Sequence, residues 1–254
     1  MDQANADPRS RLFALEQIGI KLGLEQIRGL VTALGHPDRA FPSIVVAGTN
    51  GKGSTTAMIE RGLRAAGYRT GRYTSPHLVH LEERFAVNGI AADTEAVDGS
   101  AARVLEASTR LPAPPSFFEA TTAIALDLFY RAVVEVAVLE VGLGGRLDAT
   151  NVVTPTGVVI TSIDLDHEQY LGDTITAIAA EKAGVIKPGA VVVLAQNPPA
   201  AERIVAEACV RAGTRLIRAE EGVTLDVEMR DGRATVHLAT PSRAYAPLSL
   251  ALRG

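Results

Sequence analysis

The residues best suited to chemistry form one stretch between an apolar run and an apolar helical pattern, Gly48-Thr49-Asn50-Gly51-Lys52-Gly53-Ser54-Thr55. Glycines let the backbone turn tightly and present its N–H groups to phosphate oxygens, while the positive end of the following helix points at the same place. Lys52 can reach the outer phosphates, and Ser54 or Thr55 can offer a hydroxyl to phosphate or Mg²⁺. The stretch therefore predicts a phosphate-binding loop between a strand and a helix.

The match to the standard phosphate loop is imperfect, because Val46 stands where the pattern has glycine and Gly53 where it has a hydroxyl. An ordinary glycine-rich turn is the alternative, but Gly-Lys followed by Ser-Thr at a strand-to-helix junction favours the phosphate loop. This variant resembles the loop of the Mur ligase superfamily, whose members use ATP to join an amino acid to a carboxylate. The resemblance implies that Thr49 to Thr55 bind the phosphates of ATP.

Three further candidates follow separate predicted strands: Ser75, Glu140 and His167. An α/β sheet gathers the carboxyl ends of its strands at one edge, so we expect these side chains to lie near the phosphate loop. Together they could hold one or two Mg²⁺ ions, although Mg²⁺ prefers oxygen and His167 is the least expected ligand. Taken singly, Ser75 could be a turn former, Glu140 a surface carboxylate and His167 a capping side chain.

The bulk composition narrows the functional classes. The chain has 254 residues, of which 47% are apolar and 21% charged, an ordinary globular composition, and its net charge of −4 argues against a nucleic-acid binder. No apolar run approaches the roughly 18 residues of a membrane span, and residues 1–10 show no signal peptide. The single cysteine, Cys209, fits a reducing compartment. We therefore expect a cytoplasmic monomer that binds small molecules.

The elements that must position these candidates alternate between strand and helix along most of the chain. This order predicts an α/β fold, a doubly wound and mostly parallel sheet with helices on both faces. We expect two helices within residues 1–40, the α/β core over 41–218 and a small antiparallel β appendage over 219–254. The appendage is predicted because apolar and polar residues alternate on both sides of Asp231-Gly232.

Six segments together resemble one family, folylpolyglutamate synthase/dihydrofolate synthase, over roughly residues 10 to 254. The run from Glu140 to Asn151 is the most specific of them. The others are Gly48 to Thr55, Thr74-Ser75-Pro76-His77, Ser116-Phe117-Phe118-Glu119, Asp164-Leu165-Asp166-His167 with Leu171-Gly172, and Glu181-Lys182-Ala183-Gly184 with Lys187.

The resemblance implies a metal site and a modified lysine. In that family the residues matching Ser75, Glu140 and His167 hold Mg²⁺, and the lysine matching Lys182 is carbamylated and supports a second metal. A carbamate would turn a cation that repels Mg²⁺ into an oxygen ligand. Without the resemblance, Lys182 would be interpreted as a solvated surface lysine.

Four residues are candidates for contact with the substrate. Phe118 and Glu119 could line a pocket for a flat pterin ring, since such ligands favour aromatic walls with a few polar groups. Core packing at the start of a helix is the alternative for both. Arg146 and Asp148 could clamp substrate or phosphate, or form a salt bridge within their own loop.

The reaction that the resemblance implies is ATP-dependent ligation of L-glutamate to a pteroate or folate carboxylate through an acyl phosphate, with Lys52, Lys182 and His167 as its catalytic residues. A muramyl-peptide ligase and a nucleotide-binding module without catalysis are the alternatives. Family members carry a further C-terminal α/β domain, and this chain ends where its linker is expected. We therefore expect weak nucleotide binding and no ligation by these residues alone.

Overall fold

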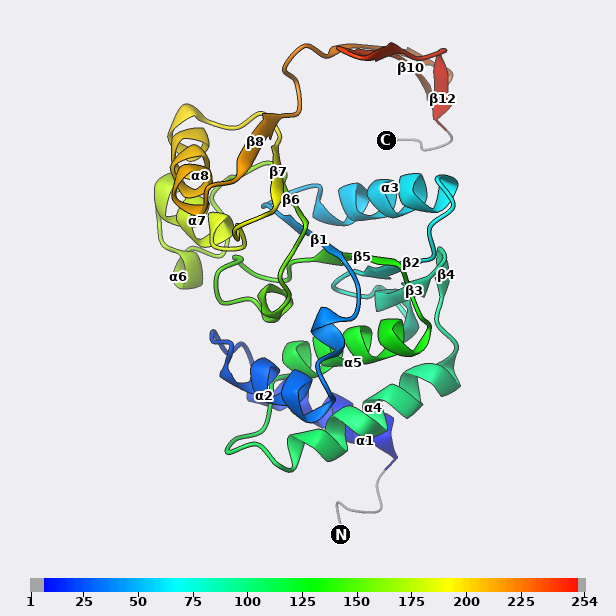
Figure 1. Ribbon diagram of the computed structural model, residues 1–254, viewed down its shortest axis with the longest axis vertical. Coiled ribbons are helices and arrows are strands. Elements are labelled where there is room, and N and C mark those ends of the chain that lie inside the picture. The colour runs from blue at the N-terminus through cyan, green and yellow to red at the C-terminus, as the bar shows by residue number, and fades with distance from the viewer. Residues whose placement is uncertain (1–6, 251–254) are drawn as a thin grey trace.

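A central sheet of eight strands carries the site, and the computed structural model describes it within residues 7–250 (Figure 1). The strand order is β4-β3-β2-β5-β1-β6-β7-β8. The strands from β2 to β8 in this order run parallel, and β3 and β4 add an antiparallel hairpin at one edge. Their bounds are β1 Ser43–Ala47, β2 Thr70–Tyr73, β3 Phe85–Val87, β4 Ile90–Ala91, β5 Val136–Glu140, β6 Gly157–Ile160, β7 Val191–Leu194 and β8 Arg215–Arg218.

Helices cover both faces of this sheet, as predicted. In Figure 1, α3 lies on one face and α5 on the other, with α4, α1 and α2 forming a further layer beyond α5. The bounds are α1 Pro8–Ala14, α2 Glu25–Ala33, α3 Lys52–Ala65, α4 Thr94–Ser108, α5 Phe117–Arg131, α6 Glu168–Leu171, α7 Ile175–Ala183 and α8 Pro199–Ala212. Short 3-10 turns occupy Leu15–Ile18, Pro37–Arg39, Leu81–Arg84 and Ala149–Val152. Among residues 7–250, no helix combines the length and the apolar character needed to cross a membrane.

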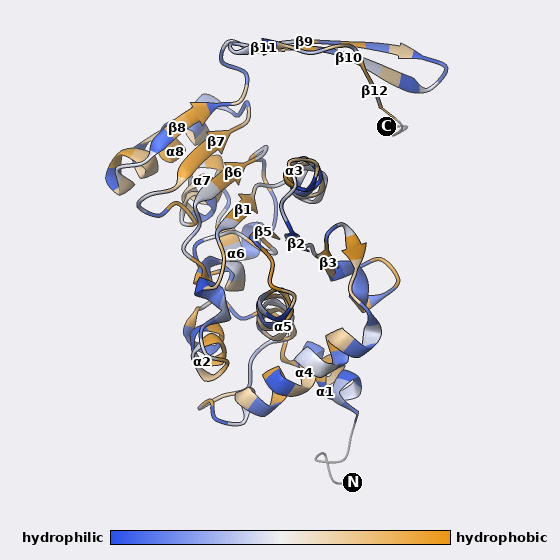
Figure 2. Cartoon of the chain, turned by 45° about the vertical axis from the view of Figure 1, so that its right-hand side comes forward, coloured by the Kyte–Doolittle hydropathy of each residue, from blue (hydrophilic) through white to orange (hydrophobic). Residues whose placement is uncertain are grey.

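The core lies where the sheet meets α5. All five residues of β5 are buried, and Figure 2 shows the central strands as hydrophobic, which is typical of a parallel sheet covered on both faces. The helix α5 is buried from Glu119 to Phe129 because it lies between the sheet and the outer helices. Its first turn is closed by a capping box, in which Ser116 and Glu119 bond each other's backbone N–H.

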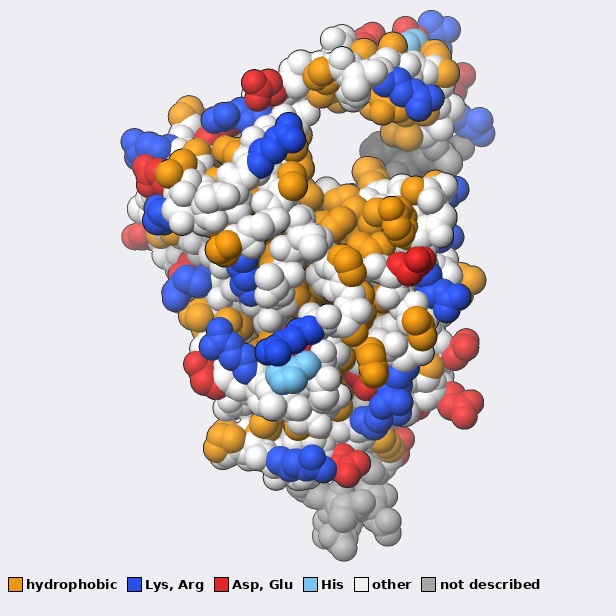
Figure 3. Space-filling model, viewed as in Figure 1, with side chains coloured by type: hydrophobic (Ala, Val, Ile, Leu, Met, Phe, Trp, Pro, Cys, Tyr) orange, Lys and Arg blue, Asp and Glu red, His pale blue; other side chains and the backbone are white. Residues whose placement is uncertain are grey.

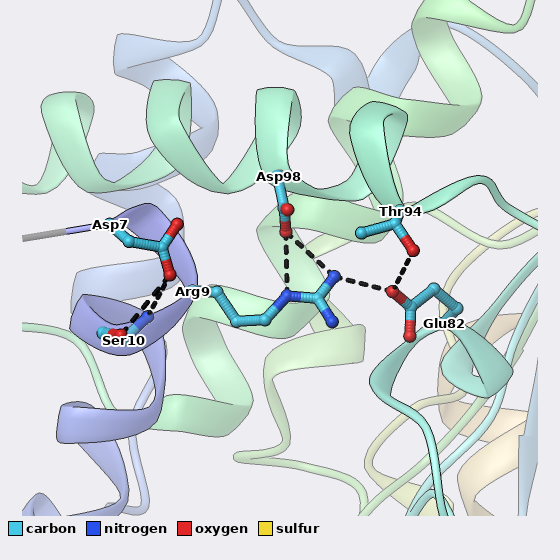
Figure 4. Close-up of polar contacts among 6 residues, drawn as sticks. All are labelled: Asp7, Arg9, Ser10, Glu82, Thr94 and Asp98. Carbon is cyan, nitrogen blue, oxygen red and sulfur yellow. Dashed lines mark hydrogen bonds and ion pairs between the residues drawn. The ribbon is translucent and has the colours of Figure 1, made fainter.

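An ion-pair network fixes the N-terminal helix to the rest of the fold (Figure 4). The guanidinium of Arg9 lies 2.6 Å from Oε1 of Glu82 and 2.9 Å from Oδ1 of Asp98. Thr94 donates a further hydrogen bond to Glu82 at 2.8 Å. Burial raises the pKa of Glu82, but the bonds from Arg9 and Thr94 outweigh it and lower that pKa to about 2.

The predicted antiparallel appendage is confirmed as a second sheet of four strands that projects beyond α3 (Figure 1). Its strands are β9 Thr224–Arg230, β10 Arg233–Thr240, β11 Arg243–Ala244 and β12 Leu248–Leu250. The register pairs Val227 with Val236, so apolar side chains share one face. In Figure 3, hydrophobic side chains also cover the surface below this sheet, over α3. Met58, a residue of α3, is among the exposed apolar side chains.

The elements depart from the sequence prediction at three places. The largely apolar run from Val158 to Ile163 predicts a single strand, but β6 ends at Ile160, because the next residues leave the ladder to hold the phosphate loop. The edge strand β8 and the short helix α6 were not predicted. Only two apolar residues occupy β8, and α6 is four residues long, so neither shows a periodic pattern.

Candidate active site

The predicted phosphate loop connects β1 to α3 and is fixed by the segment that follows β6. The N–H of Thr49 donates to the carbonyl of Ser162 at 2.6 Å, and Oγ1 of Thr49 accepts from the N–H of Asp164 at 3.0 Å. Gly48 has a φ of 145°, and a Cβ there would lie 1.8 Å from Oγ1 of Thr161. Only glycine fits at position 48, which explains the start of the motif.

Backbone N–H groups at the start of α3 remain available to bind a ligand. Gly51 ends the loop with a φ of 81°, and Lys52 begins α3. The first intrahelical bond runs from Thr55 to Gly51 at 3.0 Å, so the N–H groups of the first turn, Lys52 to Ser54, are free to bind an anion. The side-chain nitrogen of Lys52 donates to the carbonyl of Thr49 at 3.0 Å, and the Ser54 side chain is exposed. This geometry suits phosphate oxygens.

Two of the three predicted strand-end residues meet beside this loop. The N–H of Ser75, after β2, donates to Oε2 of Glu140, the last residue of β5, at 3.1 Å. A Cβ on Gly53 would lie 3.4 Å from Oε1 of Glu140. A larger side chain at position 53 would occupy the space beside that carboxylate, which gives a physical reason for the glycine that departs from the standard loop.

Glu140 fits a cation ligand. It is 5% exposed, its Oε1 accepts no hydrogen bond within the described residues, and no cationic side chain there forms an ion pair with it. Burial raises its pKa, partly opposed by the Ser75 N–H and by the charge of Lys52. Residues 7–250 contain no cluster of three His, Cys, Asp or Glu side chains suited to a metal. A Mg²⁺ ion here would therefore complete its shell with hydroxyl, water and phosphate oxygens.

The third predicted ligand, His167, is not joined to this pair. It precedes α6 with a φ of 49°, its side chain is 51% exposed, and its nearest carboxylate is Asp166, 3.7 Å away. It makes no hydrogen bond or ion pair with Ser75 or Glu140. Its role as a metal ligand stays a prediction.

Lys182 is a buried residue of the site rather than a solvated one. Its side chain is 3% exposed and its Nζ donates to the carbonyl of Gly48 at 2.8 Å, which links α7 to the phosphate loop. Burial and the nearby charge of Lys52 lower the pKa of Lys182 to about 8, against the opposing charges of Asp166 and Asp148. With this pKa, a substantial fraction of the amine is neutral near neutral pH, and the neutral amine is the form that reacts with CO₂.

Arg146 and Asp148 do not pair with each other. Arg146 forms an ion pair with Glu181 at 2.7 Å, on the outer side of the loop. The carboxylate of Asp148 is buried and accepts from the N–H groups of Gly142, Leu143 and Thr150 at 2.9–3.0 Å. Burial raises its pKa, and these bonds oppose the rise. The alternative of a salt bridge between these two residues is therefore excluded, because each charge has a separate partner.

A cavity of about 370 Å³ lies next to Ser75, between α5, the loop after β5 and the segment after α1. Phe118 forms one wall, and a Cβ on Gly142 would lie 2.5 Å from its ring. Glu119 and Asp148 also line the cavity, whereas Arg146 does not. The carboxylate of Glu119 is already used by the N–H and hydroxyl of Ser116, both at 2.8 Å.

Sequence reasoning missed Arg84 in this wall. Arg84 is 6% exposed and lines the cavity, and its Nε donates to Nδ1 of His77 at 2.8 Å. The available signal was an arginine directly before the apolar residues Phe85-Ala86-Val87. That position alone does not distinguish a buried arginine from a surface one.

Sequence comparison identifies the relatives of this chain. Residues 46–244 match the family of the Mur ligase middle domain. The chain is 42% identical over 210 residues to the dihydrofolate synthase/folylpolyglutamate synthase of Bacillus subtilis, covering 81% of this chain and 49% of that protein. It is 37% identical over 249 residues to the protein of the same name from Mycobacterium tuberculosis, covering 91% and 51%.

Solved structures give the same result. An E. coli FolC in complex with DHPP and ADP superposes with a TM-score of 0.84 at 35% identity, covering 98% of this chain and 59% of that one. An FPGS–AMPPCP complex superposes with a TM-score of 0.90 at 32% identity, covering 97% and 62%. The chain thus spans about half the length of the curated relatives it matches.

Proposed function

Since the chain belongs to the Mur ligase family, whose middle domain it matches over residues 46–244, we propose that it is the ATP-binding part of a glutamate ligase. The substrate is a pteroate or folate, and its carboxylate is joined to L-glutamate. The similar proteins named dihydrofolate synthase/folylpolyglutamate synthase support this assignment, as do the relatives solved with ADP, AMPPCP and DHPP.

The observation that carries the proposal is a continuous path from the cavity to the phosphate loop. Ser75 lines the cavity and donates to Glu140, and Glu140 lies against Gly53 of the loop. A flat ligand whose ring packs on Phe118 can therefore extend its carboxylate toward the site of the outer phosphate. Bringing two reactants together in this way is the main means by which enzymes accelerate phosphoryl transfer.

The proposed reaction has two chemical steps, which groups of this chain assist. The ligand carboxylate attacks the terminal phosphorus of ATP, ADP leaves, and the resulting acyl phosphate is attacked by the amino group of glutamate with release of phosphate. Lys52 and the first N–H groups of α3 neutralise the charge that develops on the phosphate oxygens. The apolar cavity walls exclude water from the acyl phosphate.

Glu140 and Ser75 would hold Mg²⁺, with His167 as the further predicted ligand. When bound, Mg²⁺ supplies charge neutralisation at the phosphates. Lys182 would carry the carbamate, for which its burial and its lowered pKa of about 8 are the support.

We also propose that the protein is a cytoplasmic monomer. Its one cysteine, Cys209, is buried and free, as expected in a reducing compartment. The candidate site is built from a single chain, so no second copy is needed to form it.

The test is ligand binding by calorimetry to residues 1–254. We expect ATP and dihydropteroate each to bind, Lys52→Ala to weaken only ATP, and Phe118→Ala to weaken only dihydropteroate. A UDP-linked muramyl peptide, the substrate of the alternative ligase, serves as the control and is expected not to bind. Binding of the muramyl peptide in place of dihydropteroate would overturn the proposal. Because no ligation is expected from these residues alone, a separately expressed C-terminal ligase domain is added, and release of phosphate that then requires both dihydropteroate and glutamate would separate a ligase from a nucleotide-binding module.

A further inference from the structure

Arg84 is a buried cation that forms no ion pair within the described residues. It is 6% exposed, yet no carboxylate oxygen of residues 7–250 lies within 4.0 Å of its guanidinium nitrogens. Its Nε has an acceptor in His77, whereas Nη1 and Nη2 have none within the described residues. A largely buried charge is costly unless something pairs with it. This arrangement indicates that a ligand supplies the partner.

The guanidinium is held in place on two sides. Nδ1 of His77 accepts from Nε at 2.8 Å, and the ring of Phe117 lies under the guanidinium with its centre 5.3 Å from Cζ. Phe117 is itself stacked on Phe13, with ring centres 5.7 Å apart. Arginine in a fixed orientation presents a planar fork that matches a carboxylate.

Arg84 lies in the wall of the cavity at its reactive end. Its Nη atoms have no hydrogen-bond partner within the described residues and are not sealed from solvent, so a ligand can reach them. The N–H of Thr74 donates to the carbonyl of Arg84 at 3.0 Å, which places Arg84 next to Ser75. Two buried carboxylates in the cavity wall, those of Glu119 and Asp148, already accept hydrogen bonds from backbone N–H groups. The remaining charged residues in its wall are Glu16 and Lys21.

We propose that Arg84 binds the carboxylate of the aromatic ligand in this cavity, and that His77 is the residue that positions Arg84. The proposal deepens the proposed function and rests on it. It also gives the substrate class a required feature, a ring system that fits beside Phe118 and ends in a carboxylate.

The test compares two ligands that differ only in this group, 7,8-dihydropteroate and the same molecule without its carboxylate. Wild type is expected to bind dihydropteroate about ten- to a hundredfold more tightly, the range of one charge-assisted contact. Arg84→Gln should lower its affinity to that of the carboxylate-free analogue while leaving the analogue's affinity unchanged. Arg84→Lys should keep part of the preference for dihydropteroate. Arg110→Gln, on the surface, is the control and should keep the full preference of wild type.

His77 is tested by rescue. His77→Ala removes the acceptor for Nε and should reduce the preference for the carboxylate, whereas His77→Asn restores an oxygen acceptor and should return most of it. If His77 only filled space, His77→Ala and His77→Asn would not differ in their preference for the carboxylate. Equal affinities for dihydropteroate in both would overturn the positioning role.

The remaining outcomes separate this inference from the proposed function. Equal affinity of wild type for the two ligands, or a full preference kept by Arg84→Gln, would overturn the role of Arg84. If Arg84→Gln does not fold, Arg84→Lys and the wild-type ligand pair still decide. If wild type binds neither pterin, the proposed substrate is wrong, and benzoate becomes the probe. Benzoate binding that does not depend on Arg84 would then overturn the inference itself.

Discussion

The side-chain nitrogen of Lys182 donates to the carbonyl oxygen of Gly48 at 2.8 Å, joining α7 to the first glycine of the phosphate loop. Gly48 lies next to the loop residues proposed to bind phosphate, so a chemical change on Lys182 occurs within the nucleotide site. The same contact keeps Lys182 buried, and burial is what lowers its pKa to about 8.

We predict that Lys182 reacts with CO₂ near neutral pH. A pKa of about 8 leaves a substantial neutral fraction at that pH, while a lysine of pKa 10.5 stays almost fully protonated. Carbamylation should increase as pH rises through about 8 and disappear in acid, where the amine is protonated. NMR with isotopically labelled bicarbonate should show one signal in wild type that is absent in Lys182→Met. A signal that survives in Lys182→Met would place the carbamate elsewhere.

Lys52→Ala should weaken ATP binding by about ten- to a hundredfold, because one charge-assisted contact to the outer phosphates is lost. The half-buried side chain makes one hydrogen bond, to Thr49, so the fold should be kept. Calorimetry measures the affinity and thermal unfolding checks the fold. Unchanged ATP affinity in a folded variant would contradict the role of Lys52.

Glu140→Gln should reduce the gain in ATP affinity that Mg²⁺ provides. Glutamine can still accept the N–H of Ser75, so the variant removes the charge and keeps the bond. Titration of ATP with and without Mg²⁺ measures the gain, which we expect to fall by roughly tenfold, the effect of one weakened ligand. Glu135→Gln, directly before the same strand, is the matched control. A gain equal to that of wild type would exclude Glu140 as a ligand.

Asp148→Asn should destabilise the fold by about 1–3 kcal/mol, because an amide N–H₂ must face backbone donors that now bond a carboxylate. The N–H groups of Gly142 and Leu143 share Oδ2 of Asp148, and that of Thr150 bonds Oδ1. Urea unfolding measures the loss. Unchanged stability combined with weaker pterin binding would instead indicate that Asp148 serves only to bind the substrate.

Glu82→Gln should lower stability at pH 7 by an amount of order 1 kcal/mol, since Glu82 accepts from Arg9 and Thr94. The pKa of Glu82 in the fold is about 2, below its ordinary value of 4.5. Its contribution is therefore complete above pH 4.5 and is lost as pH falls toward 2. Urea unfolding between pH 7 and acid should show the gap between wild type and variant closing. Glu106→Gln, in an exposed pair with Arg110, should show almost no gap at any pH.

The sequence by itself determined the fold class and the strand–loop–helix arrangement of the phosphate loop. These features are local, because a strand, a glycine turn or a capped helix is encoded within about a dozen neighbouring residues. The apolar run before Gly48 forms strand β1, and Lys52 begins helix α3, as predicted. The meeting of Ser75 with Glu140 also followed, since parallel strands end at one edge of the sheet.

Only the tertiary structure decided which partner each charged side chain has. Lys182 is buried against Gly48, and Arg146 pairs with Glu181 rather than with Asp148, although Asp148 is two residues away. Arg84 lines the cavity and forms no ion pair within the described residues, and His77 and Phe117 hold its guanidinium there. These environments are made by segments far apart in the chain. Charge, burial and orientation therefore depend on packing, which no local sequence pattern records.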